Sequence, residues 1–359
     1  MITSDFSNLK IAGIAAAVPT KCVRAHDYDE LFGEKTVSKN ISSAGMEQTY
    51  HASEAQTSSD LAYAAAKNLM EKMDIDPSSI GVLIFVAGYL DYQVPPTACV
   101  LHSRLGLSTD CMAFDTDLGC SGYVYGLQML CATLQTSSAK RGLLLTGDIT
   151  SKVVSPLDKS RLLFGDGGSA TLVEKCEAEV PFHFGMKTDG SRFKSIIVPA
   201  GAYRNINASR ERTEWADGNI RSDYNLFMDG MEVFKFTMTD VPGLATEFME
   251  HYGHSVDDFD SFIFHQPNLF ILKHLMKKLN IPEEKMPISL DRYGNTSVCA
   301  IPITICDAYH GKSGEKKLFI YGFGVGLSWA CASIAIDASH VYPIEHTDDY
   351  FKDGSVSHG

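Results

Sequence analysis

The chain has 359 residues, 45% of them hydrophobic and 21% charged, so it can bury a large core in two domains or one two-lobed domain. Its net charge of −13 argues against nucleic acid as the main partner. No apolar run reaches the ~18 residues of a membrane-spanning helix, and residues 1–10 do not resemble a signal peptide. The nine cysteines include no Cys-x-x-Cys pair, which predicts a cytoplasmic protein without disulfides or a zinc site, and no membrane partner is expected.

The segment around Cys120 carries the first functional signal along the chain. A short strand is expected over residues 112–116, and the apolar run 122–136 is long enough for a central helix. Cys120 lies between them, where Gly119 and Gly122 allow a tight turn and a close approach of substrate to the backbone. The positive end of a helix lowers the pKa of a nearby thiol, so this placement predicts a nucleophile. A small buried core cysteine is the alternative.

Other polar or glycine-rich stretches of the chain favour structural roles. Asp115 and Asp117 have the spacing of a metal pair, but no third ligand is near and strand alternation explains them. Residues 164–169 are interpreted as a structural turn. The polar stretch 201–225 predicts a flexible lid, and the residues from His340 onward predict a tail beyond the fold.

Five segments of the first half recur in the same order in the second half. The matched pairs are 81–86 with 260–264, 112–116 with 286–290, 122–136 with 297–310, 141–148 with 317–322, and 169–173 with 328–332. The period is too long for a solenoid and predicts two copies of one β/α unit, residues 1–178 and 179–339, followed by a tail over 340–359. Both copies are expected to bring their strand ends to one shared cleft.

Two polar residues and one loop of the second half belong to this predicted cleft. His265 directly follows the buried strand 260–264 and is either a capping residue or a site residue. Asn295 follows Gly294 in the turn that matches the turn of Cys120, although on its own this segment is better explained as an ordinary helix start. The glycine-rich loop 322–326 runs between two strands, so its backbone N–H groups suit an oxyanion better than a pyrophosphate.

Together these segments resemble the thiolase-superfamily condensing enzymes, and most closely β-ketoacyl-acyl-carrier-protein synthase III. The six matching motifs are residues 117–123, 164–167, 230–235, 265–268, 294–298 and 322–326, in the family's order. The resemblance extends from residue 11 to residue 336 and implies an α/β fold of five layers, αβαβα, and a homodimer. It also implies a catalytic triad of Cys120, His265 and Asn295.

The resemblance implies the chemistry as well. Cys120 would accept an acyl group from a coenzyme A or acyl-carrier-protein thioester and condense it with a malonyl thioester as carbon dioxide leaves, with no cofactor besides these substrates. Backbone N–H groups of Cys120 and Val325 would form the oxyanion hole, and His265 and Asn295 would bind the malonyl carbonyl. Two alternatives are acyl transfer from Cys120 to a hydroxyl or an amine, and an inactive subunit of a heterodimeric synthase.

The residues expected to bind substrate follow from the same resemblance. They are Val94, Met228, Gly230, Phe234, Pro267 and Asn268. Val94 replaces the bulky aromatic that many relatives extend into the acyl pocket of the partner subunit, which predicts room for a longer or branched acyl group.

The chain departs from the family where coenzyme A and the carrier protein would bind. Residues 39–45 lack the tryptophan and arginine that grip coenzyme A, and Lys152 replaces another contacting arginine. Phe270 stands in place of an arginine that docks the carrier protein. Lys273, Lys277 and Lys278 share the spacing of one helix face, which either meets an acidic carrier protein or is simply solvated.

Overall fold

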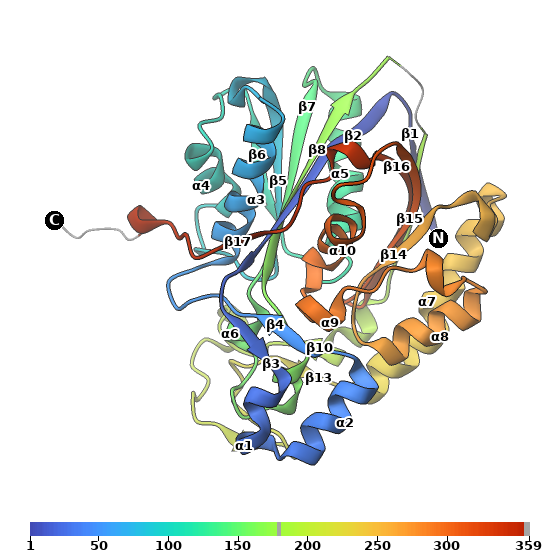
Figure 1. Ribbon diagram of the computed structural model, residues 1–359. Coiled ribbons are helices and arrows are strands. Elements are labelled where there is room, and N and C mark those ends of the chain that lie inside the picture. Colours follow the sequence, from blue (N-terminus) through green and yellow to red (C-terminus); the bar gives the residue numbers. More distant parts are fainter. Residues whose placement is uncertain (178–180, 355–359) are drawn as a thin grey trace.

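The strands of the computed structural model, which describes residues 1–177 and 181–354, repeat one topology twice (Figure 1). The first set runs in the order β2 (Leu9–Pro19), β8 (Gly167–Lys175), β7 (Arg141–Asp148), β5 (Ile80–Val86) and β6 (Met112–Thr116). The second set runs in the order β1 (Ile2–Phe6), β9 (Phe182–Thr188), β16 (Ser328–Asp337), β15 (Glu315–Gly324) and β14 (Ser261–Phe264). One register pair, Ile336 with Ile11, connects the two sets.

Strand directions are the same for four strands of each set, whereas β6, parallel to β5, and β1, antiparallel to β9, have no counterpart. β5 is parallel to β7, and β7, β8 and β2 are successively antiparallel. β14 is likewise parallel to β15, and β15, β16 and β9 are successively antiparallel. The strands predicted as matched pairs at 81–86 and 260–264, at 141–148 and 317–322, and at 169–173 and 328–332 therefore occupy equivalent positions. The predicted boundary between the halves falls on residues 178–180 and lies outside the described residues.

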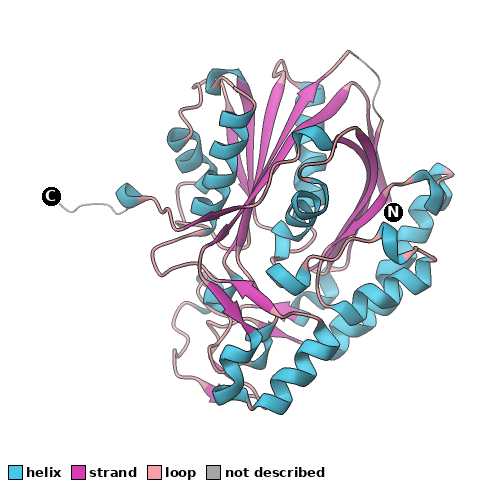
Figure 2. Cartoon of the chain, viewed as in Figure 1, coloured by secondary structure: helices cyan, strands magenta, loops and turns pink. Residues whose placement is uncertain are grey.

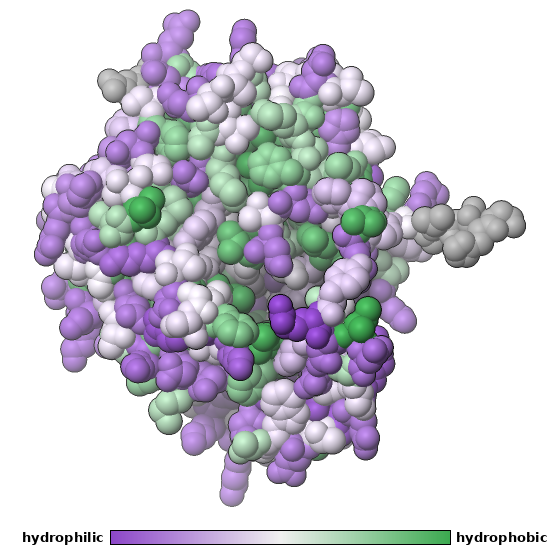
Figure 3. Space-filling model, turned by 180° about the vertical axis from the view of Figure 1, so that it is seen from behind, coloured by the Kyte–Doolittle hydropathy of each residue, from purple (hydrophilic) through white to green (hydrophobic). Residues whose placement is uncertain are grey.

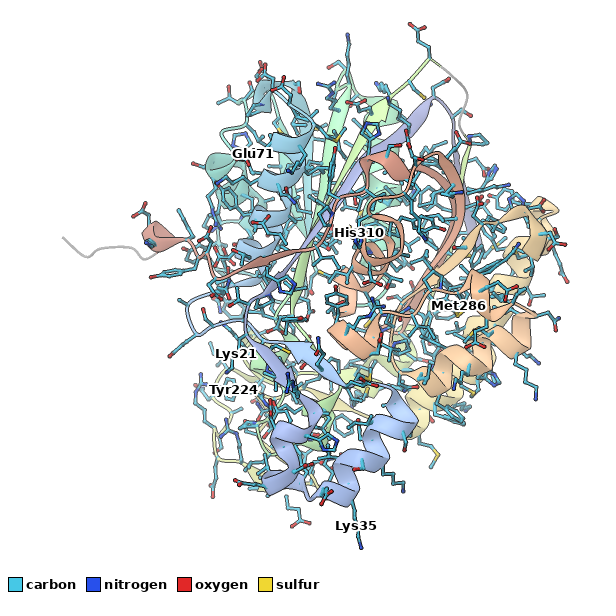
Figure 4. The ribbon with its side chains drawn as sticks, viewed as in Figure 1. Lys21, Lys35, Glu71, Tyr224, Met286 and His310 are labelled. Carbon is cyan, nitrogen blue, oxygen red and sulfur yellow. The ribbon has the colours of Figure 1, made fainter. Side chains whose placement is uncertain are left out.

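One predicted pair is wrong, because residues 286–290 do not form a strand matching β6. Pro287 has no N–H to donate to a sheet, and the backbone N–H of Ser289 instead donates to Oε1 of Gln266 at 3.2 Å. Met286 is buried against the helices on the outer side of this half (Figure 4). The chain then enters the short helix α9 (Leu290–Tyr293).

Three helical layers enclose the two sheets (Figure 2). The outer helices α3 (Ser58–Lys72) and α4 (Thr97–Arg104) pack on the first sheet, and α7 (Gly230–Tyr252) and α8 (Leu269–Leu279) pack on the second. Helices α5 (Gly122–Thr136) and α10 (Ala300–Tyr309) lie between the sheets. The result is the expected five-layer αβαβα arrangement.

Residues on the central strands alternate between two buried faces. On β5, Leu83 and Phe85 pack toward α3 and α4, whereas Ile84 packs toward α5. On β15, Phe319 contacts the outer helices and Ile320 the central ones. Because helices cover both faces of each sheet, these strands are continuously apolar instead of alternating between polar and apolar residues.

A smaller lobe of short elements lies below the sheets in Figure 1. It contains α1 (Asp29–Phe32), α2 (Glu34–Ala44), α6 (Thr150–Val153), β3 (Cys22–Arg24), β4 (Gln48–Tyr50), β10 (Ile196–Ile197), β11 (Thr213–Glu214), β12 (Ile220–Arg221) and β13 (Phe227–Met228). The stretch 201–225, expected as a flexible lid, is folded into this lobe. β11 pairs with β12, and Nε of the buried Arg221 donates to Asp158 at 2.8 Å, with the guanidinium 5.1 Å from the Trp215 ring.

The expectation that the tail leaves the fold at His340 is wrong for residues 341–354. β17 (Glu345–Thr347) pairs in parallel with β2, and the chain continues to Gly354 against α3 (Figure 1). Buried hydrogen-bond partners from distant segments hold this extension, and no local sequence pattern reveals them. The last part of the predicted tail, 355–359, lies outside the described residues.

Hydrophobic residues on the face seen in Figure 3 are interspersed with hydrophilic ones. Among the described residues, no helix combines the length and apolar character needed to cross a bilayer.

Candidate active site

Cys120 lies in the turn between β6 and α5, as the sequence predicts. Ser121 is the N-cap of α5, and its hydroxyl lies 2.6 Å from the hydroxyl of Ser328 on β16 of the other sheet. Gly324 on β15 closes the other side of the turn, since a Cβ there would be 2.8 Å from Cβ and 2.9 Å from Sγ of Cys120. The close approach of the two sheets therefore requires glycine at this position.

A cavity of about 690 Å³ opens at Cys120, and residues from both halves line it. His265, Asn295 and Val325, all predicted site residues, are part of this lining, as are Met228 and Pro267 from the predicted substrate-binding set. Tyr224, labelled in Figure 4, lines the cavity from the small lobe. The structure thus brings the nucleophile candidate of the first half together with the imidazole and carboxamide of the second.

His265 follows β14 and is held by its backbone, whose N–H donates to the carbonyl of Tyr321 at 2.7 Å. The edge of its ring meets the Phe323 ring, with 5.5 Å between the ring centroids. Burial lowers the pKa of His265 to about 3, although a hydrogen bond with the Ser297 backbone acts in the opposite direction. The imidazole is therefore neutral near pH 7. Its Nδ1 is buried and has no hydrogen-bond partner among the described residues.

Asn295 is oriented by contacts on both sides. Its Oδ1 accepts a hydrogen bond from the backbone N–H of Ser297 at 2.9 Å, which leaves the amide nitrogen as the group free to donate into the cavity. Its backbone N–H donates to the carbonyl of Leu163 at 2.8 Å, and its carbonyl accepts from Gly165 at 3.2 Å. Residues 164–166 of the predicted turn thus hold Asn295 from the first half, whereas residues 167–169 are not a turn but the start of β8.

The surroundings of the Cys120 sulfur differ from the sequence expectation in one respect. Burial raises the pKa of the thiol to about 11, and the charge of Asp148 adds to the increase. Ser297, whose Oγ lies 3.8 Å from Sγ, and the Val325 backbone N–H act in the opposite direction. The expected lowering by the helix terminus is therefore outweighed, because the sulfur is enclosed by both sheets and faces a carboxylate.

Sequence reasoning missed Asp148 and Ser297 as parts of the site. Asp148 ends β7, lines the cavity and accepts a hydrogen bond from the Thr150 backbone N–H at 2.8 Å. Burial raises the pKa of Asp148 to about 7, and a hydrogen bond with the Ser297 side chain counteracts this. The available signal was the position of Asp148 at the end of β7, a strand of the same sheet as β6, which leads to Cys120.

Four predicted substrate-binding residues do not line the cavity. Val94 is 82% exposed, and the half-exposed Phe234 stacks on Phe270 with 6.0 Å between the ring centroids. Gly230 is the first residue of α7, and Asn268 caps α8 by accepting a hydrogen bond from Ile271 N–H at 2.8 Å. Their geometry in the single chain is that of surface and capping residues.

The residues considered for coenzyme A and carrier-protein contact lie on the surface around the small lobe and α8. Residues 39–45 form the end of α2 and its cap at Gly45. The ammonium of Lys152 is bonded to the Glu54 and Gln56 carbonyls. The three α8 lysines, Lys273, Lys277 and Lys278, are all exposed.

The interpretation of Asp115 as a structural residue agrees with its contacts. Its carboxylate accepts hydrogen bonds from Thr97 N–H and Ala98 N–H, both at 2.6 Å, and thereby caps α4. In residues 1–177 and 181–354, no group of three or more His, Cys, Asp or Glu side chains could hold a metal ion.

Comparison with known proteins gives one consistent family. The 3-Oxoacyl-[acyl-carrier-protein (ACP)] synthase III model matches residues 114–190, and the model of its C-terminal part matches residues 249–336. A β-ketoacyl-[acyl-carrier-protein] synthase III of Caldanaerobacter subterraneus is 31% identical, with 90% of this chain and 96% of the relative covered.

Solved structures of the same kind superpose closely on this fold. A 3-oxoacyl-(acyl-carrier protein) synthase of Burkholderia xenovorans has a TM-score of 0.90 and 36% identity, with 96% of this chain and 99% of that chain covered. The β-ketoacyl-[acyl carrier protein] synthase III of Thermus thermophilus has a TM-score of 0.80 and 27% identity, with 92% and 100% covered. The chain belongs to the 3-oxoacyl-[acyl-carrier-protein] synthase III family of thiolase-fold acyltransferases, which are decarboxylative condensing enzymes.

Proposed function

We propose that Cys120 carries the acyl group of a decarboxylative condensation, with His265 and Asn295 binding the malonyl donor. The observation that carries this assignment is that all three side chains line one cavity, although they come from separate strand ends of two halves. The free amide nitrogen of Asn295 supports its role as a hydrogen-bond donor to the malonyl carbonyl.

In the first half-reaction the Cys120 thiol loses its proton and its sulfur attacks the carbonyl carbon of an acyl thioester. A bond from Sγ to the acyl carbon forms, the bond from that carbon to the donor sulfur breaks, and the departing thiolate takes up a proton. The oxyanion formed on the way is stabilised by the backbone N–H groups of Cys120 and Val325. Both N–H groups lie within hydrogen-bonding reach of the Cys120 sulfur, next to the carbonyl that it attacks.

In the second half-reaction a malonyl thioester occupies the cavity beside the acylated Cys120. Its bond to the carboxylate carbon breaks, carbon dioxide leaves, and the electron pair remains as an enolate on the thioester oxygen. His265 and the Asn295 amide donate hydrogen bonds to that oxygen. The carbanion attacks the acyl carbonyl, the bond to Sγ breaks, and Cys120 takes up a proton.

The substrates are proposed to be acyl thioesters of coenzyme A or an acyl carrier protein, with a malonyl-carrier thioester as the second substrate. The names of the relatives support a carrier protein as partner. Exposed Lys273, Lys277 and Lys278 on α8 offer positive charge to an acidic carrier. Lys152 bonds to backbone carbonyls, so it supports a coenzyme A contact less than an unbonded cation would.

We further propose that two copies of the chain form a homodimer in the cytoplasm. Among the described residues β6 pairs only with β5, so its other edge is free to pair with a second copy. Exposed Met112 at the start of β6 and exposed Val94 support an apolar contact there. All nine cysteines are free thiols, which supports a reducing compartment. Sedimentation at several concentrations would contradict the dimer by giving a monomer throughout.

The assignment is tested by incubating the protein with acyl-coenzyme A and acyl-carrier thioesters, followed by intact mass and peptide mapping. We expect one acyl adduct on Cys120, which malonyl-carrier protein discharges with release of carbon dioxide. Parallel reactions with an alcohol and an amine test transfer to oxygen or nitrogen. Discharge by these acceptors and not by malonyl-carrier protein would overturn the condensation, and no adduct on Cys120 with any donor would overturn its role as nucleophile.

A further inference from the structure

The C-terminal extension beyond the family match is anchored by buried groups. The family model ends at residue 336, yet β17 pairs with β2 and the chain continues to Gly354. The side-chain amide of Gln56, which is fully buried, donates to the carbonyls of Thr347 at 2.9 Å and Asp349 at 3.1 Å. A buried carboxamide with both contacts made is a specific anchor, because losing the extension would leave its amide nitrogen without these two acceptors.

Phe351 sits on a buried ion pair of α3 and α4. Its backbone N–H donates to Oδ1 of Asp60 at 2.8 Å, and that carboxylate lies 2.9 Å from Nη2 of Arg104. The Arg104 guanidinium is stacked between two aromatic rings, 4.7 Å from the Phe351 centroid and 4.3 Å from the Tyr63 centroid. The extension thus completes the surroundings of a guanidinium that is almost entirely buried.

The same network reaches the loop between β5 and α4, residues 87–96. Arg104 donates to the hydroxyl of Ser59 at 3.2 Å, and that hydroxyl donates to Oδ2 of Asp91 at 2.6 Å. The next loop residue, Tyr92, donates its hydroxyl directly to the carbonyl of Gly354. The extension is therefore joined to this loop by one direct contact and by a chain of buried polar contacts.

This loop forms one wall of the active-site cavity. Gly88, Tyr89 and Leu90 line it, and the Tyr89 hydroxyl forms a hydrogen bond with the Thr150 side chain. That hydroxyl is also close enough to interact electrostatically with Cys120. A shift of this wall changes the space next to the acyl-carrying sulfur.

We propose that residues 345–354 are a strap that positions the loop 87–96 and thereby sets which acyl groups the cavity accepts. The acyl part of this proposal rests on the proposed role of Cys120. Its physical basis is the position of Asp91 and Tyr92, which directly follow the cavity-lining Leu90. Tyr92 bonds to the strap at Gly354, and Asp91 bonds to Ser59, a member of the buried polar network that contacts the strap. Releasing them frees the loop to move outward and enlarges the cavity, so longer acyl groups gain relative to short ones.

The test compares two substitutions that each remove one hydroxyl. Tyr92→Phe deletes the contact with Gly354, whereas Tyr350→Phe deletes an exposed hydroxyl that has no hydrogen-bond partner among the described residues. For Tyr92→Phe we expect about five-fold faster hydrogen exchange in peptides covering 87–96, as for the loss of one ordinary hydrogen bond. We also expect the ratio of octanoyl to acetyl loading rates on Cys120 to rise by about three-fold or more. Tyr350→Phe is expected to change neither quantity.

Phe351→Ala and a chain ending at Ile344 extend the test, with larger increases expected in the same two measurements. The matched tyrosine pair remains decisive if the shortened chain does not fold. Unchanged exchange in 87–96 for Tyr92→Phe and Phe351→Ala would overturn the strap, and faster exchange with an unchanged loading ratio would overturn its role in acyl selection. Exchange needs no substrate, so absence of any Cys120 adduct in the unaltered chain would separately overturn the proposed function.

Discussion

The two halves of the molecule share a strand order but place different chemical groups in the cavity. In the first half β6 leads directly into Cys120 and α5, so the strand end presents a sulfur. In the second half no strand occupies the matching position, and an irregular segment leads through α9 to Asn295. The segment that replaces the strand, residues 286–289 and α9, leads to Asn295, whose amide nitrogen is a hydrogen-bond donor. The two halves therefore place different chemical groups at equivalent points of the fold.

The two halves also contribute different buried titratable groups to the cavity, an acid from the first half and a base from the second. Asp148 ends β7 in the first half, and burial raises its pKa to about 7. His265 follows β14 in the second half, and burial lowers its pKa to about 3. Both shifts favour the neutral form, so these two groups are uncharged together between about pH 3 and about pH 7.

The largest expected effect comes from removing the reactive group of the first half. Cys120→Ala should lower acyl loading by about 10⁴-fold or more, because no other group in the site forms the covalent bond. Loading is measured by intact mass with a radiolabelled acyl thioester as a second readout. Cys99→Ala, at an exposed cysteine, is the control and should load normally. An adduct that persists in Cys120→Ala would assign the acyl group to another residue.

Removing the donors of the second half should separate the two half-reactions. His265→Ala and Asn295→Ala should retain loading within a few-fold, while decarboxylation of the malonyl thioester falls by about 10²–10³-fold as for the loss of an oxyanion donor. Released carbon dioxide and acyl-enzyme are measured in the same reaction. Normal condensation by His265→Ala would show that the halves do not divide the work in this way.

A smaller effect is expected where the halves touch. In Gly324→Ala the new Cβ would lie 2.9 Å from Sγ of Cys120, so either the sulfur or β15 must move. Loading should fall by about 10–100-fold through misplacement of the nucleophile. Unfolding free energy should fall by about 1–3 kcal/mol, as for overpacking. Gly243→Ala, whose Cβ has nothing within 4 Å, is the matched control and should leave loading unchanged.

The smallest effects concern the pH dependence of stability, where the halves should have opposite signs. The pKa of Asp148 is raised from 3.8 to about 7, so the folded state binds the extra proton and the stability contribution falls as pH rises through this range. The pKa of His265 is lowered from 6.5 to about 3, so its contribution is present above 6.5 and is lost as pH falls toward 3.

Denaturant unfolding between pH 4 and pH 6 therefore tests both groups, each contributing a slope of about 1.4 kcal/mol per pH unit at most. Asp148→Asn should make stability rise more steeply with pH, and His265→Gln should make it rise less steeply. Parallel slopes for the unaltered chain and both variants would contradict the burial of these groups. In the same variants, Asp148→Asn should also speed alkylation of Cys120 near pH 8, because the Asp148 charge raises the pKa of the thiol.

Much of the scaffold was accessible from sequence because it depends on local apolar runs. The strands at 81–86, 141–148 and 169–173 and their counterparts are continuous apolar segments, and the five-layer fold follows from their order and from the resemblance to a known family. The convergence of Cys120, His265 and Asn295 on one cavity was expected for the same reason. Their catalytic roles remain predictions.

The features that sequence reasoning missed depend on contacts between distant segments. The apolar stretch 286–290 suggested a strand, but Pro287 and the bond from Ser289 to Gln266 exclude one. The tail is ordered by Gln56 and by the Asp60–Arg104 pair, which no local pattern links to it. The direction of the Cys120 pKa shift depends on enclosure by both sheets and on Asp148, neither of which is visible from the helix start alone.

The pairing of Phe164 with Asn295, reinforced by the bond from Gly165 N–H to the Asn295 carbonyl, has a consequence for substrate entry. A hinge motion of one half relative to the other would break these backbone contacts and move the Asn295 carboxamide away from the Cys120 sulfur. We therefore expect substrates to enter through movement of loops around the cavity, with Asn295 held at a fixed distance from Cys120. Turnover in this protein should accordingly respond to changes at the cavity rim while the spacing of the reacting groups stays fixed.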